Sequence, residues 1–139
     1  MAKSANTLPD TNVVLRYLMR DEPEQFELAA DFFEQVRTGK KKMLILESVL
    51  VESVYILTKF YQVPKKEAAD VLKGLLQYRG AVNRDKSALC AALALYAEKN
   101  LDLVDCVLIA KATHGAAEVF SFDKALNYEA GKWVLSDSK

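Results

Sequence analysis

The sequence predicts an α/β fold: a three-layer α/β/α sandwich in which helices cover both faces of a small central parallel sheet. The main observation is that short apolar runs alternate with longer helical stretches along the chain, which is typical of parallel strands joined by crossover helices. The second is that the 139 residues contain no internal repeat, low-complexity tract or Gly/Ser linker. We therefore expect a single domain spanning residues 1–139.

Short apolar runs mark the expected strands. They lie at residues 43–46, 119–122 and 133–135, with a weaker run at 81–82 and a weak first strand before Asp10. This first strand is poor in Val, Ile and Leu, and Pro9 has no N–H for a ladder hydrogen bond, so the length of the strand is left open. Phe120, Phe122 and Trp133 lie in these runs, and we expect their side chains in the core.

Longer periodic stretches mark the expected helices, at residues 11–20, 22–38, 48–61, 65–78, 86–98 and 103–114. Pro23 and Pro64 each suit the first position of a helix, and Gly39 follows the last turn of the helix that begins near Pro23. The helix from Val49 to Phe60 is apolar nearly all round, which predicts that it lies in an interior or at an interface.

Composition and charge exclude several classes of protein. Hydrophobic residues make up 51% of the chain and charged residues 27%, so a disordered chain is a poor fit. No apolar run approaches the ~18 residues of a membrane span, and the N-terminus lacks the apolar core of a signal peptide, so we expect a cytoplasmic protein. Lys+Arg and Asp+Glu both number 19. This balance argues against non-specific coating of nucleic acid, but not against an enzyme that acts on it.

The two cysteines, Cys90 and Cys106, lie in apolar surroundings and show no CxxC or Cys/His spacing. We expect two reduced, buried thiols and no zinc site.

Four acidic residues stand at predicted strand exits or on helices that should dock beside them: Asp10, Glu52, Asp105 and Asp123. Each also has a structural interpretation. Asp10 and Asp123 suit helix caps, Glu52 suits a solvated helix face, and Asp105 suits the third position of a capping box that begins at Asp102.

These carboxylates are expected to meet, because ligands bind at the carboxyl ends of parallel strands. Converging carboxylates repel each other and therefore need a cation. Oxygen ligands without His or Cys favour Mg²⁺ or Mn²⁺. Such an ion can activate water and stabilise the charge that develops during phosphodiester cleavage.

Four segments carry a family resemblance. They are Asp10-Thr11-Asn12 followed by an apolar helix, Ser48–Glu52, Leu103–Ala112, which carries Asp105, and Ser121-Phe122-Asp123. In this order the chain resembles the PIN-domain ribonucleases, and more narrowly the toxins of VapBC-type toxin–antitoxin pairs. Ser121 stands where the family more often has Thr, and Cys106 stands where a small residue is usual.

The resemblance implies a metal-dependent endoribonuclease that uses Mg²⁺ or Mn²⁺ to cut single-stranded regions of RNA. It implies that the catalytic and metal-binding residues are Asp10, Glu52, Asp105 and Asp123. Asn12 and Ser121 would support them or touch the substrate, and Asp102 would be an auxiliary acid. It also implies a homodimer that a cognate antitoxin protein inhibits.

Other charged residues keep two interpretations. Arg16 and Arg20 lie on the helix that begins beside Asp10, so they are either RNA contacts or ordinary exposed residues. The basic run 37–42 either binds phosphates or is a solvated loop, and the loop is the commoner case. His114 precedes Gly115 at a helix end, where a cation interacting with the helix dipole is favoured over a catalytic base.

Two alternative functions remain. An acid-pocket phosphohydrolase of the haloacid-dehalogenase type needs Asp-x-Asp after the first strand, whereas this chain has Asp10-Thr11-Asn12, and the paired acids of a receiver domain are not found. A non-catalytic protein-interaction module would use the apolar helix around Val54 as its interface.

Overall fold

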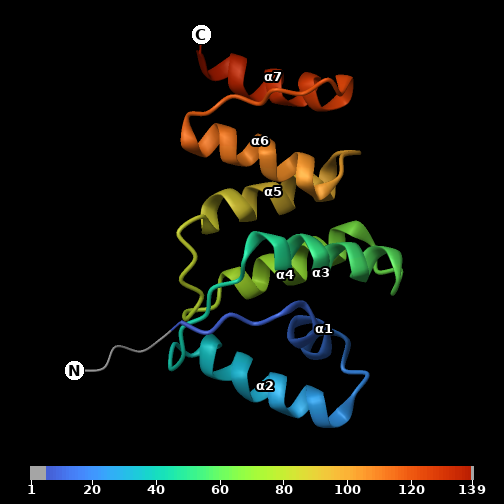
Figure 1. The fold of residues 1–139 in the computed structure, drawn as a ribbon, viewed down its shortest axis with the longest axis vertical. Helices are drawn as coiled ribbons and strands as arrows, with labels where there is room; N and C mark the ends of the chain where they lie inside the picture. Colours follow the sequence, from blue (N-terminus) through green and yellow to red (C-terminus); the bar gives the residue numbers. More distant parts are fainter. Residues whose placement is uncertain (1–5, 139) are drawn as a thin grey trace, which may run out of the picture.

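The structure, a computed structural model, describes the backbone of residues 6–138 and the side chains of residues 6–131. Its helices are α1 (Thr11–Met19), α2 (Pro23–Arg37), α3 (Glu47–Lys59), α4 (Lys65–Leu76), α5 (Lys86–Glu98), α6 (Leu103–Gly115) and α7 (Lys124–Ser138). Figure 1 shows them stacked along the long axis of the molecule, with α2 at one end and α7 at the other. Most helices pack on their neighbours in the chain, and α6 also packs on α3.

The predicted helices are confirmed, because their ends lie within two residues of the expected positions. The end signals are local. Asp10 caps α1, Pro23 is the first residue of α2, and Gly39 follows α2 with a φ of +87°. Pro64 is the N-cap of α4, one position before the first helical residue that we expected it to occupy. Short-range capping and periodicity therefore account for these boundaries.

The predicted sheet is not confirmed. In place of strands, the described residues contain two isolated parallel bridges, Thr7 to Met43 and Met43 to Ala81. Met43 N–H donates to Gly80 O at 2.7 Å, and Met43 O accepts from Val82 N–H at 2.9 Å. The segments therefore lie in a parallel arrangement with Met43 in the centre. The ladder does not extend past Leu44, because Pro9 has no N–H and the side chain of Asn83 binds the backbone of Ile45.

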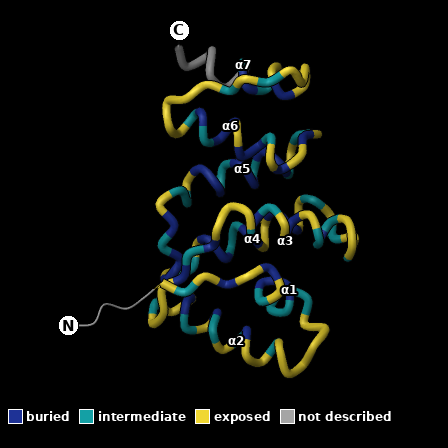
Figure 2. The backbone as a smooth tube through the Cα atoms, viewed as in Figure 1, coloured by how far each residue is buried: buried dark blue, intermediate teal, exposed yellow. Residues whose placement is uncertain are grey.

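Two other predictions for the C-terminal region are wrong. Residues 119–122 form neither a strand nor a bridge, and the side chains of Phe120 and Phe122 are 88% and 93% exposed rather than in the core. Figure 2 shows this exposed segment between α6 and α7. Residues 133–135 lie in α7 instead of a strand, and the side chain of Trp133 is outside the described residues. Periodicity alone does not separate a short apolar strand from a buried helix segment.

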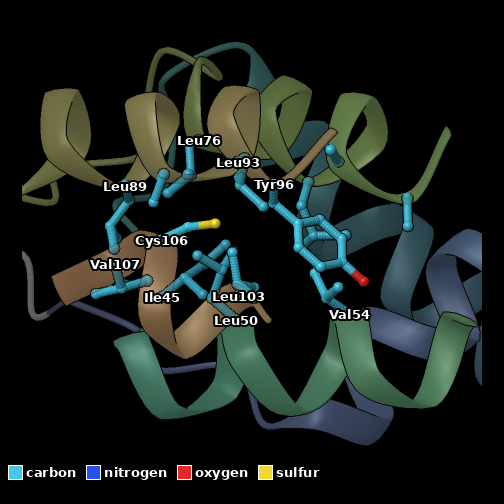
Figure 3. Close-up of a cluster of buried hydrophobic side chains, with 14 of the residues drawn as sticks. Ile45, Leu50, Val54, Leu76, Leu89, Leu93, Tyr96, Leu103, Cys106 and Val107 are labelled. Carbon is cyan, nitrogen blue, oxygen red and sulfur yellow. The ribbon is translucent and has the colours of Figure 1, made fainter. Parts of the chain in front are cut away.

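The core runs between α1 and α2 and through the region where α3, α4, α5 and α6 meet. In Figure 3, Leu50 of α3, Leu93 of α5 and Cys106 of α6 point toward one another, and each is fully buried. The prediction for the apolar helix is confirmed on one face of α3, whereas Tyr55 and Phe60 remain exposed. Across residues 6–138, no helix has the length and apolar character needed to cross a membrane.

Candidate active site

Asp10 follows the bridged segment and forms the N-cap of α1. Its Oδ1 accepts a hydrogen bond from the backbone N–H of Val13 at 3.0 Å. The capping interpretation is thus confirmed. It uses one oxygen of an exposed carboxylate, which has a second oxygen that can accept a ligand.

Glu52 projects from α3 toward the start of α1. Its Oε1 accepts a hydrogen bond from Thr11 Oγ1 at 2.5 Å, although the residue as a whole is exposed. Thr11 directly follows Asp10 and is 8% exposed. The Thr11–Glu52 bond therefore links Glu52 to the residue next to Asp10, another of the predicted acids. Glu52 is thus not simply a solvated residue.

Asp105 lies half-buried in the first turn of α6, and its pKa is raised. The main cause is burial, followed by the negative charges of Asp102 and Asp123. Asp102 is the N-cap of α6, but its side chain makes no capping hydrogen bond. The capping-box interpretation is therefore not confirmed, because Asp102 caps α6 with its backbone only and its carboxylate is not used.

Asp123 stands at the start of α7 and is held by Ser121. Asp123 Oδ1 accepts from Leu126 N–H at 2.9 Å, and Asp123 N–H donates to Ser121 Oγ at 3.0 Å. The carbonyl oxygen of Ser121 also accepts from Asn127 Nδ2 at 2.7 Å. The capping interpretation of Asp123 is confirmed, and Ser121 orients the segment that carries this acid.

The structure places the predicted acids in two groups. Asp10 and Glu52 lie at the contact of α1 with α3, and Asp105 lies with Asp102 and Asp123 where α6 meets α7. Among the residues with described side chains, no three of His, Cys, Asp or Glu are close enough together to hold a metal ion. Carboxylate oxygens are ligands that a divalent cation accepts, and positive charge beside Asp105 would offset the repulsion from Asp102 and Asp123.

A pocket of about 610 Å³ opens beside Asp10, between the bridged segment, α1 and α2. Asn12 and Arg16 line it on the polar side, and Leu28 and Phe32 are among its apolar walls. Arg16 Nε donates to Gln25 Oε1 at 2.9 Å, and Arg16 Nη1 pairs with Asp21 at 3.3 Å. Two of the predicted auxiliary residues thus share a cavity with one predicted catalytic acid.

The sequence did not lead us to a group of polar side chains that connects the start of α3, the loop before α5 and α6. Asn83 bonds to the backbone of Ile45, Asp85 accepts from Asn83, and Lys111 lies between Asp85 and Glu47. The signal that could have indicated this group is Asn83, the polar residue directly after the apolar pair at 81–82. Thr11 was also missed, because only its neighbours in the Asp-Thr-Asn segment had been assigned roles.

Two further charged segments make local contacts or are exposed. His114 lies in the last turn of α6, and its Nδ1 is 2.9 Å from the carbonyl oxygen of Ala110. Arg37 pairs with Glu34, and Lys40, Lys41 and Lys42 are exposed in the loop after α2.

The comparison with protein families decides what this arrangement belongs to. The PIN-domain profile matches residues 7–131, a range that includes all four predicted acids. The chain belongs to the PIN-domain family. This PIN domain is also 30% identical over 118 residues to a VapC ribonuclease of Aquifex aeolicus (strain VF5). The aligned region covers 84% of this chain and 87% of that protein. No solved structure matches the chain significantly.

Proposed function

We propose that this PIN domain is a metal-dependent endoribonuclease that cleaves single-stranded regions of RNA in the cytoplasm, as the toxin of a toxin–antitoxin pair. The observation that carries the proposal is the match of the PIN-domain profile to residues 7–131, a range that contains all four acids. The position of Asp105, half-buried beside Asp102 and Asp123, supports it, because the negative charges of both neighbours raise its pKa further beyond the effect of burial. Carboxylates that lie close together repel one another and destabilise the folded protein when no cation is bound. Such clusters are typical of functional sites. The similarity to a VapC ribonuclease supplies the reaction class.

In this proposal, Asp10, Glu52, Asp105 and Asp123 would supply the ligands for Mg²⁺ or Mn²⁺. When bound, the ion supplies the positive charge that favours ionisation of a water molecule and stabilises the phosphate. Thr11 orients Glu52 through its hydroxyl group, and Ser121 orients the segment of Asp123. Asn12 and Arg16, at the pocket beside Asp10, are positioned to contact the RNA backbone by hydrogen bonding and charge.

The proposal is tested by RNA cleavage with purified protein in Mg²⁺, Mn²⁺ or EDTA. Single-stranded and structured RNAs are compared for the wild type, Asp10→Asn and Asp105→Asn. We expect cleavage that requires metal and is lost in both variants. Asp70→Asn, an exposed acid on α4, is the matched control and should cleave normally. Wild-type rates in both site variants, or cleavage that EDTA leaves unchanged, would contradict the proposal.

Exposed apolar side chains favour partner binding as part of the function, and they keep the non-catalytic interaction module as the alternative. Tyr55 on α3 and Phe60, which directly follows α3, are 63% and 76% exposed, and Phe120 and Phe122 are also exposed. Such surfaces mark protein contacts when they are contiguous. We propose that they serve a homodimer and an antitoxin. Self-association measured by sedimentation, together with the absence of both metal binding and cleavage, would favour the alternative.

A further inference from the structure

Asn83 extends the short parallel ladder with its side chain. Its Oδ1 accepts from Ile45 N–H at 3.1 Å, and its Nδ2 donates to Ile45 O at 2.7 Å. Asn83 is 8% exposed and Ile45 is fully buried, so both hydrogen bonds are protected from water. Because α3 begins at Glu47, this amide holds the backbone of the segment that leads into α3.

Lys111 of α6 closes the same network from the other side. Its Nζ lies 3.0 Å from Asp85 Oδ2 and 3.4 Å from Glu47 Oε1. Asp85 Oδ1 accepts from Asn83 Nδ2 at 3.2 Å. The contacts therefore run in a ring through the start of α3, the loop before α5 and the middle of α6.

The charges within the ring are engaged. Burial would raise the pKa of Asp85, but the hydrogen bonds from Lys111 and Asn83 outweigh it and lower the pKa. The hydrogen bond to Asp85 raises the pKa of Lys111 in turn. Both side chains thus remain ionised at neutral pH, as a charge-assisted contact requires.

The ring joins the two helices that carry separate acids of the proposed site. Glu52 follows Glu47 by about one and a half turns of α3, and Asp105 precedes Lys111 by about 9 Å along the axis of α6. Each helix is a rigid element, and α3 and α6 pack on each other. A contact that fixes Lys111 against Glu47 therefore also fixes how far α6 is displaced along α3.

We propose that Lys111, paired with Asp85 and Glu47, is a positioning residue that sets the distance between Glu52 and Asp105. The inference rests on the proposed nuclease function, because these acids are part of that site. Lys111 is partly exposed, with 41% of its side chain accessible. Ion pairs this accessible contribute little to global stability, so its main effect is on geometry.

The experiment compares Lys111→Met, Lys111→Arg and Asp85→Asn with a matched control, Lys73→Met, which removes another half-exposed lysine on α4. We expect Lys111→Met to lower kcat for RNA cleavage by about 10- to 100-fold, the size of effect that a misplacement of about 1 Å produces. KM and Tm should stay near the wild-type values. Lys111→Arg should restore most of kcat, and Asp85→Asn should add little to Lys111→Met, because both act in one network.

A second readout uses metal-free protein and needs no catalysis. Spin labels at Tyr55 of α3 and Leu108 of α6, both exposed, report the distance between the helices after Cys90 and Cys106 are replaced by Ala. We expect a broader or shifted distance distribution in Lys111→Met and a wild-type distribution in Lys111→Arg and Lys73→Met.

The two readouts separate the two proposals. If the wild type does not cleave RNA, the nuclease function fails, and the distance measurement alone decides whether Lys111 positions α6. An unchanged distance distribution in Lys111→Met overturns the positioning role in either case. A loss of kcat in Lys111→Met that equals the loss in Lys73→Met overturns it as well.

Discussion

Thr11 donates its hydroxyl hydrogen bond to Glu52 across 41 positions of the chain. Thr11 is nearly buried, whereas Glu52 reaches it from an otherwise exposed position on α3. This bond connects the residue next to Asp10 to the second acid of the proposed site. It is the one direct side-chain hydrogen bond between the two elements that carry Asp10 and Glu52, among the residues that the structure describes.

Thr11→Val tests this connection, because valine keeps the shape of threonine and removes the donor. We expect a loss of about 1 kcal/mol in the free energy of unfolding, the usual contribution of one hydrogen bond, and about a tenfold fall in kcat because Glu52 is no longer oriented. Urea unfolding and RNA cleavage measure the two effects. Thr11→Ser keeps the hydroxyl and serves as the control; equal activity in the Val and Ser variants would contradict the orienting role.

Asp10 has a capping role and a proposed catalytic role, which two substitutions separate. Asparagine is as good an N-cap as aspartate, whereas alanine costs about 1 kcal/mol. We expect Asp10→Asn to melt like the wild type and to lose cleavage, and Asp10→Ala to lose both. Thermal unfolding and a cleavage assay at matched protein concentration provide the comparison. If Asp10→Asn cleaves normally, the residue is only a cap.

The raised pKa of Asp105 predicts a pH-dependent stability difference without metal. The folded protein holds the Asp105 proton more tightly than the unfolded chain, whose ordinary value is 3.8. Wild-type stability from this group is therefore lost as the pH rises from 3.8 through the folded-state pKa. Asparagine does not titrate, so Asp105→Asn should melt above the wild type at pH 7 in EDTA.

The difference in melting temperature between Asp105→Asn and the wild type should close as the pH falls below 4, because both side chains are then uncharged. The exposed Asp70→Asn variant should show no such trend. A stability loss in Asp105→Asn at every pH would show that the carboxylate is structural.

Metal binding should stabilise the folded protein if the carboxylates form one site. A ligand that binds only the folded state at 100 times its Kd adds about 2.7 kcal/mol, so Mg²⁺ or Mn²⁺ should raise Tm by several degrees. The rise should vanish in Asp105→Asn and in Glu52→Gln, which come from the two separate acid groups. A rise that depends on only one group would show that the ion binds there without joining them.

Much of this molecule could be predicted from short-range signals. The start of α1 is encoded by Asp10 and the start of α2 by Pro23, and the end of α2 by Gly39. Each signal acts on backbone groups within about one helical turn. It can therefore be recognised from the local sequence without knowledge of the rest of the chain. The candidate acids and the family resemblance could also be recognised from the sequence, because each motif is a contiguous segment of the chain.

Contacts between distant residues were decided only by the tertiary structure. Asn83 replaces a ladder partner for a residue 38 positions away, and Lys111 reaches an acid 26 positions away. Neither contact follows from propensity, because a polar side chain has equal local reasons to face water. The exposure of Phe120 and Phe122 was likewise undetermined by their apolar character. Residue type sets the free energy gained on burial, but only the packing of the other elements decides which surface is available to bury it.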